Sequence, residues 1–191
     1  NPQRMNGVNN VVHQLATHQT LLGQHVQVWG ITPSPEGSFP DRNYETRLFQ
    51  SYSNKFRIDH KLVKAIRETS AETMFHLHGG FIPEFYHAVK ILRAADREVI
   101  FPPHGSYNTS ALEQNHFVKS LYFPLFEKSV LSSAKMIHFL GKTEYEAVEK
   151  LIPGTHKILI PNGQDLNELK FTYTQMPKNS GTVFGFCGRL T

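Results

Sequence analysis

The chain has 191 residues with 39% hydrophobic side chains, which suits a folded domain with a sizeable core. Its formal net charge is +4, but the Lys and Arg residues are scattered and form no basic run, so no nucleic-acid partner is expected. No apolar run approaches the length that crosses a bilayer, and a single cysteine, Cys187, excludes an internal disulfide framework. The first residues lack the apolar stretch of a signal peptide, so we expect a cytoplasmic protein.

The chain opens with a helix pattern followed by a strand pattern. Apolar residues spaced i, i+3, i+4, i+7 from Val8 to Leu22 predict an amphipathic helix that Gly23 ends. A β-rich alternation over 25–31 predicts the strand that follows. Together they form a βαβ unit without its first strand, which either lies upstream of Asn1 or does not exist.

The rest of the chain continues the alternation of helices and strands. Helical spacing is expected around 58–66 and 85–92, over 112–133 with a break or kink at Pro124, and in a short helix that ends at 151 and starts with a capping box from Thr143 to Glu146. Strands are expected over 47–52, 73–78, 98–101, 136–140 and 157–160, after a proline-rich loop over 32–43. Short connections between them predict a doubly wound α/β domain, a parallel sheet with helices on both faces.

Two composition changes suggest domain boundaries. Residues 1–167 are expected to form the Rossmann-like domain. The polar segment 168–180, which includes Pro177, is typical of an interdomain linker. The apolar run from Gly181 onward is expected to be the first strand of a second domain, cut short at Thr191.

Candidate binding loops follow from the rule that ligands bind beyond the carboxyl ends of parallel strands. Four loops qualify by sequence: 4–8, 78–80, 104–106 and 162–163. Gly7 in the first loop lies at a helix N-terminus, where backbone N–H groups favour a phosphate. His104 follows a buried strand and precedes Gly105, so its imidazole is expected to reach the cleft. His76, one step deeper in its strand than His78, is expected to be a packed core histidine.

Two other interpretations of these residues were weighed. His76 and His78 share one face of a strand, and with His104 they suggest a zinc site, although no carboxylate or H-x-x-x-H cluster supports a metal. Glu127 is expected to be structural, either solvated or capping a neighbouring loop.

Several motifs, in this order and spacing, carry a resemblance to a known family. They are His76-Leu-His-Gly-Gly80, Pro102-Pro-His-Gly-Ser106, Ile160-Pro-Asn-Gly-Gln-Asp165 and Gly188-Arg-Leu190. The chain resembles the N-terminal half of a GT-B glycosyltransferase of the nucleotide-sugar-dependent family 4. The resemblance implies that a sugar is transferred from a nucleotide-diphospho-sugar to a sugar or lipid-linked acceptor, with retention at the anomeric carbon and in polysaccharide biosynthesis. It implies no metal and no required cofactor beyond the nucleotide-sugar co-substrate.

The resemblance also implies roles for individual residues and partners. His104 would be catalytic, and the donor diphosphate would be bound by Asn6, which replaces a family glycine, together with Gly7 and Arg189. The substrate would contact His78, Gly105, Ser106, Asn162 and Gly163. The missing C-terminal domain would complete the cleft, so the chain alone is expected to be inactive. Peripheral association with the inner face of a membrane is a further expectation.

Two alternatives remain at this stage. A nucleotide-sugar epimerase can share the GT-B architecture, and it would form the epimer from the donor without an acceptor. A stand-alone flavodoxin-like binding module would need the chain to end naturally at Thr191.

Overall fold

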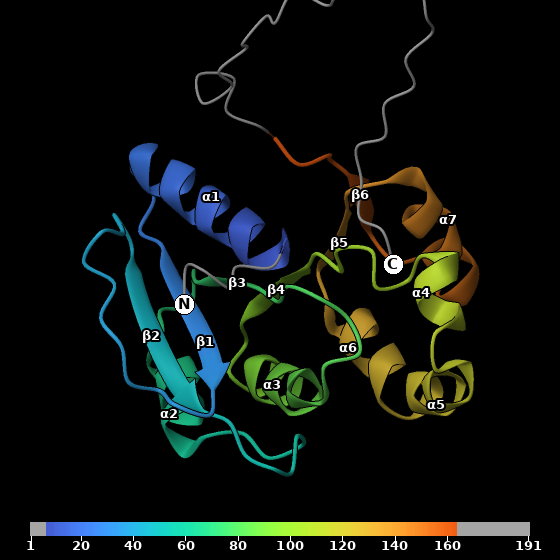
Figure 1. Ribbon diagram of the computed structural model, residues 1–191, viewed down its shortest axis with the longest axis horizontal. Helices are drawn as coiled ribbons and strands as arrows, with labels where there is room; N and C mark the ends of the chain where they lie inside the picture. Colours follow the sequence, from blue (N-terminus) through green and yellow to red (C-terminus); the bar gives the residue numbers. More distant parts are fainter. Residues whose placement is uncertain (1–6, 164–191) are drawn as a thin grey trace, which may run out of the picture.

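The computed structural model describes residues 7–163 and has the α/β architecture that the sequence predicts (Figure 1). All strand pairs within this range are parallel, and helices connect the successive strands except the first two, which a loop joins. The candidate ligands Asn6 and Arg189, the expected linker 168–180 and the expected second domain from 181 lie outside the described residues.

The first third of the described chain forms a two-stranded sheet with a helix on either side of it. Its elements are α1 (Gly7–Leu21), β1 (Gln27–Thr32), β2 (Glu45–Gln50) and α2 (His60–Glu68). Gly23, with φ of 83°, ends α1 in the left-handed conformation that the sequence predicted. Asp59 is the N-cap of α2, and its carboxylate accepts from the N–H groups of Lys61 and Gln50, both at 2.9 Å. This one side chain therefore joins the end of β2 to the start of α2.

The remaining strands form a four-stranded parallel sheet in the order β3-β4-β5-β6. Its strands are β3 (Met74–His76), β4 (Glu98–Phe101), β5 (Met136–Phe139) and β6 (Lys157–Leu159). The helices between them are α3 (Pro83–Ala94), α4 (Thr109–Glu113), α5 (His116–Tyr122), the π-helical turn η2 (Phe123–Glu127), α6 (Lys128–Ser133) and α7 (Lys142–Leu151). Strand β4 matches the predicted range 98–101, whereas β3 is shorter than predicted.

The strands are parallel as predicted, but backbone hydrogen bonds divide those in the described residues into two sheets and not one. Side-chain contacts, and not backbone hydrogen bonds, join the two sheets. Trp29 of β1 packs edge-on against Phe49 of β2, with ring centroids 5.4 Å apart, and against Phe75 of β3 at 5.5 Å. The two sheets are therefore held together by an aromatic contact.

The predicted long helix over 112–133 is interrupted at two places, one of them the expected Pro124. Helical structure begins earlier, at Thr109, the first break falls at Asn115, whose φ is 54°, and the second is the π turn that includes Pro124. Asparagine tolerates this left-handed conformation better than most residues. Pro124, the expected breaker, lies in η2, where the wider π turn accommodates a residue that has no N–H to donate.

The predicted capping box at the start of α7 is also wrong. The helix begins at Lys142, so Gly141 is its N-cap and makes no side-chain cap bond. Thr143 is already inside the first turn. Glu146 instead forms an exposed ion pair with Lys142 at 3.6 Å, one helical turn away.

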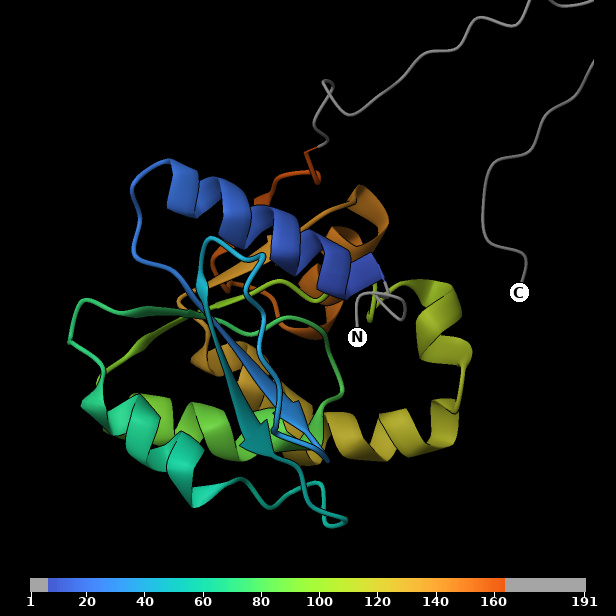
Figure 2. The same cartoon turned by 60° about the vertical axis from the view of Figure 1, so that its left-hand side comes forward.

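Helices cover both sides of the strands. Helix α1 lies on the opposite side of the molecule from α2, α3 and α6, as two views of the ribbon agree (Figures 1 and 2). The main core forms between the four-stranded sheet and helices α3, α6 and α7. Its fully buried residues are Val89, Phe101, Tyr107, Val130, Leu131, Ile137, Phe139 and Val148. Among the described helices, none combines the length and apolarity needed to span a membrane.

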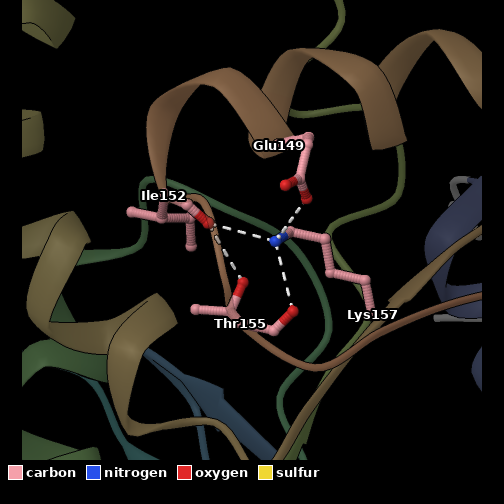
Figure 3. Close-up of polar contacts among 4 residues, drawn as sticks. All are labelled: Glu149, Ile152, Thr155 and Lys157. Atoms are coloured by element: carbon pink, nitrogen blue, oxygen red, sulfur yellow. Dashed lines mark hydrogen bonds and ion pairs between the residues drawn. The ribbon is translucent and has the colours of Figure 1, made fainter.

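The turn between α7 and β6 is closed by one buried lysine (Figure 3). The Lys157 side chain is 2% exposed, and its ammonium donates to the carbonyls of Ile152 at 3.0 Å and Thr155 at 3.2 Å. It also pairs with Glu149 at 2.7 Å. A cation at a helix C-terminus satisfies carbonyls that have no partner within the helix. This contact fixes the direction in which β6 leads to the Asn162–Gly163 loop.

Candidate active site

The histidines predicted to form the site lie on one face of the four-stranded sheet. Phe75 and Leu77 pack against the hydrophobic core. Side chains alternate along an extended chain, so His76 and His78 point to the other face. The expectation that His76 is packed in the core is therefore wrong: the residue is exposed, although its ring stacks on that of His78 at a centroid distance of 6.1 Å.

His78 and His104 are in direct contact, although 26 residues separate them in the chain. Nδ1 of His78 lies 2.8 Å from Nε2 of His104, and the two rings stack at a centroid distance of 5.1 Å. Burial lowers the pKa of His78 to about 3, with a further contribution from His104. Burial, followed by the neighbouring His138, also lowers the pKa of His104. Both rings are therefore neutral at pH 7, and one donates the shared hydrogen bond to the other.

This contact determines which ring nitrogens of the two histidines remain for other partners. It uses Nδ1 of His78 and Nε2 of His104, which leaves Nε2 of His78 and Nδ1 of His104 as the nitrogens not engaged in the pair. His138 on the neighbouring strand is oriented differently. Its Nε2 donates to the Ile160 carbonyl at 2.8 Å, because a carbonyl can only accept.

The backbone of both histidine loops is held in left-handed conformations. His104 has φ of 55° and Gly105 of 85°, and in the other loop Gly79 has φ of 101° and Phe81 of 57°. For a non-glycine residue this region costs about 1–2 kcal/mol. His104 and Phe81 therefore need contacts that hold them there.

The His104 loop is held by the carboxylate of Glu144 from α7. Oε2 accepts from the N–H of Gly105 at 2.9 Å, and Oε1 accepts from the N–H of Tyr107 at 3.0 Å. Glu144 is only 3% exposed. Burial raises its pKa, against the opposing effect of the two backbone hydrogen bonds. The loop thus forms a concave set of N–H donors whose anion is supplied by the protein itself.

The other histidine loop is held by a second buried carboxylate, that of Glu127 in η2. Its Oε1 accepts from the N–H of Phe81 at 2.8 Å and from the hydroxyl of Tyr107. Burial raises the pKa of Glu127, and it also raises the pKa of Tyr107 well above its usual value. Among the described residues, Oε2 of Glu127 has no hydrogen-bond partner. Of the two structural roles expected for Glu127, solvated or capping a neighbouring loop, these contacts match the second.

The two loops also contact each other directly. Oγ of Ser106 accepts from the N–H of Gly80 at 3.0 Å and donates to the Pro103 carbonyl at 2.7 Å. A Cβ atom on Gly80 would lie 2.8 Å from Cβ of Ser106 and 3.0 Å from the hydroxyl of Tyr107. The N–H of Gly105 and the hydroxyl of Ser106, both expected to contact substrate, thus have protein partners that hold the loops together.

The other predicted site residues in the described range lie apart from this network. Gly7 is exposed at the first position of α1, and no atom of the described residues outside α1 lies within 4 Å of a Cβ built on it. Asn162 and Gly163 are exposed in the loop after β6. Between residues 7 and 163, no three His, Cys, Asp or Glu side chains are grouped to hold a metal ion.

A cavity of about 180 Å³ lies elsewhere, between α1 and the β1–β2 sheet. His13 and Tyr44 meet on its wall through a hydrogen bond of 2.7 Å. The guanidinium of Arg42 lies 4.0 Å from the ring centroid of Phe39 and donates to Thr46 at 2.9 Å. This cavity is open and has a mainly apolar lining, and its lining residues do not include the paired histidines.

Sequence reasoning did not assign Tyr107 and Glu144 to the site. Tyr107 follows Ser106 directly, but nothing in the pattern shows that its ring turns into the core. Glu144 precedes Tyr145 in a short charged helix, and acidic residues in a first turn are ordinarily solvated. The sequence does contain one signal, the glycines of these loops, because glycine-containing turns often direct backbone N–H groups toward an anion.

Residues 5–168 match the family model of Glycosyltransferase Family 4. Searches of curated proteins and of solved structures gave no match.

Proposed function

Because the chain belongs to glycosyltransferase family 4, we propose that it transfers a sugar from a nucleotide-diphospho-sugar to an acceptor hydroxyl, with retention at the anomeric carbon. In this proposal residues 1–167 form the acceptor-side domain, and a second domain from residue 181 binds most of the donor. The acceptor is a sugar or a lipid-linked sugar. The observation that supports the proposal most strongly is the paired, neutral His78 and His104 at adjoining glycine loops.

A neutral imidazole suits the chemistry of sugar transfer. The carbon that reacts gains positive charge as the nucleoside diphosphate leaves, and a protonated histidine beside it would oppose that charge. The low pKa of His78 and of His104 keeps both rings uncharged. His104, with Nδ1 outside the histidine pair, can then hydrogen-bond a sugar hydroxyl without adding charge. His78 holds the ring of His104 in place through their shared hydrogen bond and ring stacking.

The leaving group needs cationic or N–H partners. We propose that Asn6 and Gly7, at the N-terminus of α1, together with Arg189 bind the diphosphate, since a guanidinium fork and free backbone N–H groups both suit phosphate oxygens. The open space around Gly7 is compatible with such an approach. Asn162, Gly163 and the histidine loops would line the sugar side of the cleft. The mechanism requires no metal ion and no cofactor other than the nucleotide-sugar.

The experiment that tests the proposal uses the full-length protein. Purified protein is incubated with a panel of nucleotide-diphospho-sugars, with and without sugar or lipid-linked acceptors, and nucleoside diphosphate and glycosylated product are both quantified. We expect product to appear only when donor and acceptor are both present. Epimerised donor in the absence of acceptor would support the epimerase, and binding without turnover of any donor would support a binding module.

A further inference from the structure

We infer that Glu144 is a positioning residue for His104: its carboxylate fixes the backbone that presents the His104 ring to the sugar. The inference rests on the proposed function for its catalytic consequence. Its structural basis is the pair of hydrogen bonds from Gly105 and Tyr107, the first and third residues after His104. Glu144 itself makes its hydrogen bonds to the loop backbone and would not contact the substrate.

The loop that carries His104 has an uncommon backbone conformation. His104 and Gly105 are both left-handed, with φ of 55° and 85°. The turn that these residues form directs the N–H groups of Gly105 and Tyr107 toward the carboxylate of Glu144, as in other backbone turns that bind an anion. If this anion were absent, the N–H groups of Gly105 and Tyr107 would be buried without partners, and the strained His104 backbone would relax toward a common conformation.

The Glu144 carboxylate restrains the loop at two points. The carboxylate binds with both oxygens, one to each N–H, at 2.9 and 3.0 Å. A single acceptor would restrain the distance of the loop from α7, whereas two acceptors on a rigid carboxylate also restrain its rotation. Rotation of this loop would move the His104 ring relative to His78, with which it shares a hydrogen bond of 2.8 Å.

Tyr107 connects the His104 loop to the loop that carries His78. Tyr107 donates its N–H to Glu144 and its hydroxyl to Glu127, and Glu127 accepts from Phe81 in the His78 loop. The carboxylates of Glu144 and Glu127 both bind Tyr107. They therefore fix the positions of the two histidine loops relative to each other. Glu144 binds the backbone of the loop that carries His104, and Glu127 binds the backbone of the loop that carries His78.

The chain offers a matched pair of substitutions to test this. Glu144→Gln keeps the size of the side chain but places an amide NH₂ against one of the two N–H donors, so only one hydrogen bond can remain. Glu146→Gln is the control, because Glu146 lies on the same helix, is exposed and forms an ion pair with the exposed Lys142. Both variants remove one negative charge from α7.

The deciding measurement is a double-mutant cycle on the full-length enzyme. We expect Glu144→Gln to lower kcat/KM by about 10- to 100-fold, mainly through kcat, the size expected for losing a hydrogen bond to a charged group. Glu146→Gln should leave both parameters unchanged. In a His104→Ala background, Glu144→Gln should cause little further loss, because a positioning residue has nothing left to position. Equal losses in both backgrounds would overturn the inference and indicate a general effect on folding.

A second readout does not depend on activity. With ¹⁵N-labelled histidine, the ring-nitrogen resonances of His104 and His78 should shift in Glu144→Gln and stay unchanged in Glu146→Gln. Unshifted resonances in Glu144→Gln would contradict the positioning role even in an enzyme of another activity. If the resonances shift but no donor is turned over by any variant or by the wild type, the proposed function fails and the positioning role stands.

Discussion

The hydroxyl of Tyr107 donates to Oε1 of Glu127 inside the protein, where both side chains are at most 1% exposed. This hydrogen bond spans 20 residues and connects the loop that carries His104 to the helical segment that also holds the His78 loop. It makes the two loops, which are separate in sequence, one structural unit.

Replacement of Tyr107 by Phe should therefore destabilise the protein. The change leaves the buried carboxylate of Glu127 with the N–H of Phe81 as its remaining donor among the described residues, and we expect a loss of about 1–3 kcal/mol in the free energy of unfolding. Urea denaturation measures it. Tyr145→Phe is the control, because Tyr145 is a partly buried tyrosine that packs its ring on Phe139. An equal loss in both variants would contradict the assigned role of the Tyr107 hydroxyl.

Gly80→Ala should disrupt the contact between the two loops. The added methyl group would lie 2.8 Å from Cβ of Ser106, closer than real Cβ contacts, so the backbones must separate. We expect a loss of about 1–3 kcal/mol in the free energy of unfolding.

Gly37→Ala is the matched control for that change, because the nearest atom to its added Cβ lies 3.5 Å away, an ordinary van der Waals contact, and its φ is not positive. It should alter the free energy of unfolding by less than about 0.5 kcal/mol. Thermal or urea unfolding of the two variants measures both changes. A Gly80→Ala variant with the wild-type free energy of unfolding would refute the close approach of the loops.

The paired histidines predict a pH dependence of stability. The folded-state pKa of His78 is lowered to about 3, below its usual value of 6.5. The unfolded chain therefore binds a proton between these values when the folded chain does not, and stability falls as pH decreases from about 6.5, at most by about 1.4 kcal/mol per pH unit. Above pH 6.5 this contribution is constant.

Glu127 and Glu144, whose folded-state pKa values are raised, have the opposite pH dependence, so the test is a comparison of variants. His78→Asn, whose amide nitrogen replaces Nδ1, should lose less stability than the wild type between pH 7 and pH 5. His116→Asn, on the exposed side of α5, should follow the wild type. Parallel curves for all three proteins would show that His78 does not titrate abnormally.

Lys157→Met should weaken the turn that leads out of α7. The substitution keeps the length of the side chain but leaves the carbonyls of Ile152 and Thr155 without the ammonium donor (Figure 3). We expect a loss of about 1–3 kcal/mol by denaturant unfolding. Lys142→Met, which removes only an exposed ion pair, should cost less than about 0.5 kcal/mol. Similar losses at both sites would contradict this interpretation.

The comparison of sequence with structure shows where each kind of inference succeeds. The apolar periodicity that predicted α1, α3 and β4 is a local property, and their order predicted the α/β class. The bidentate contact of Glu144 with the His104 loop joins residues 37 and 39 positions apart, which no local pattern encodes. The capping box failed because α7 begins one residue before Thr143.

The position of His104 was predicted more completely than its surroundings. A histidine after a buried strand and before a glycine was expected at the edge of the sheet, and the structure places it there beside His78. The exposed position of His76 was not foreseen, since a short apolar stretch does not say which face of a strand is covered. The partners of Gly105 and Ser106 depended on tertiary contacts that the sequence does not show.

The most direct test of the account is the effect of His104→Ala on sugar transfer by the full-length enzyme. We expect kcat/KM to fall by an amount equivalent to about 2–4 kcal/mol of transition-state stabilisation, with the protein still folded at the assay temperature, because His104 would act at the reacting sugar. His116→Ala, an exposed histidine on α5, should retain wild-type kinetics. Unchanged kinetics in His104→Ala, or an activity loss that unfolding fully accounts for, would contradict the central claim.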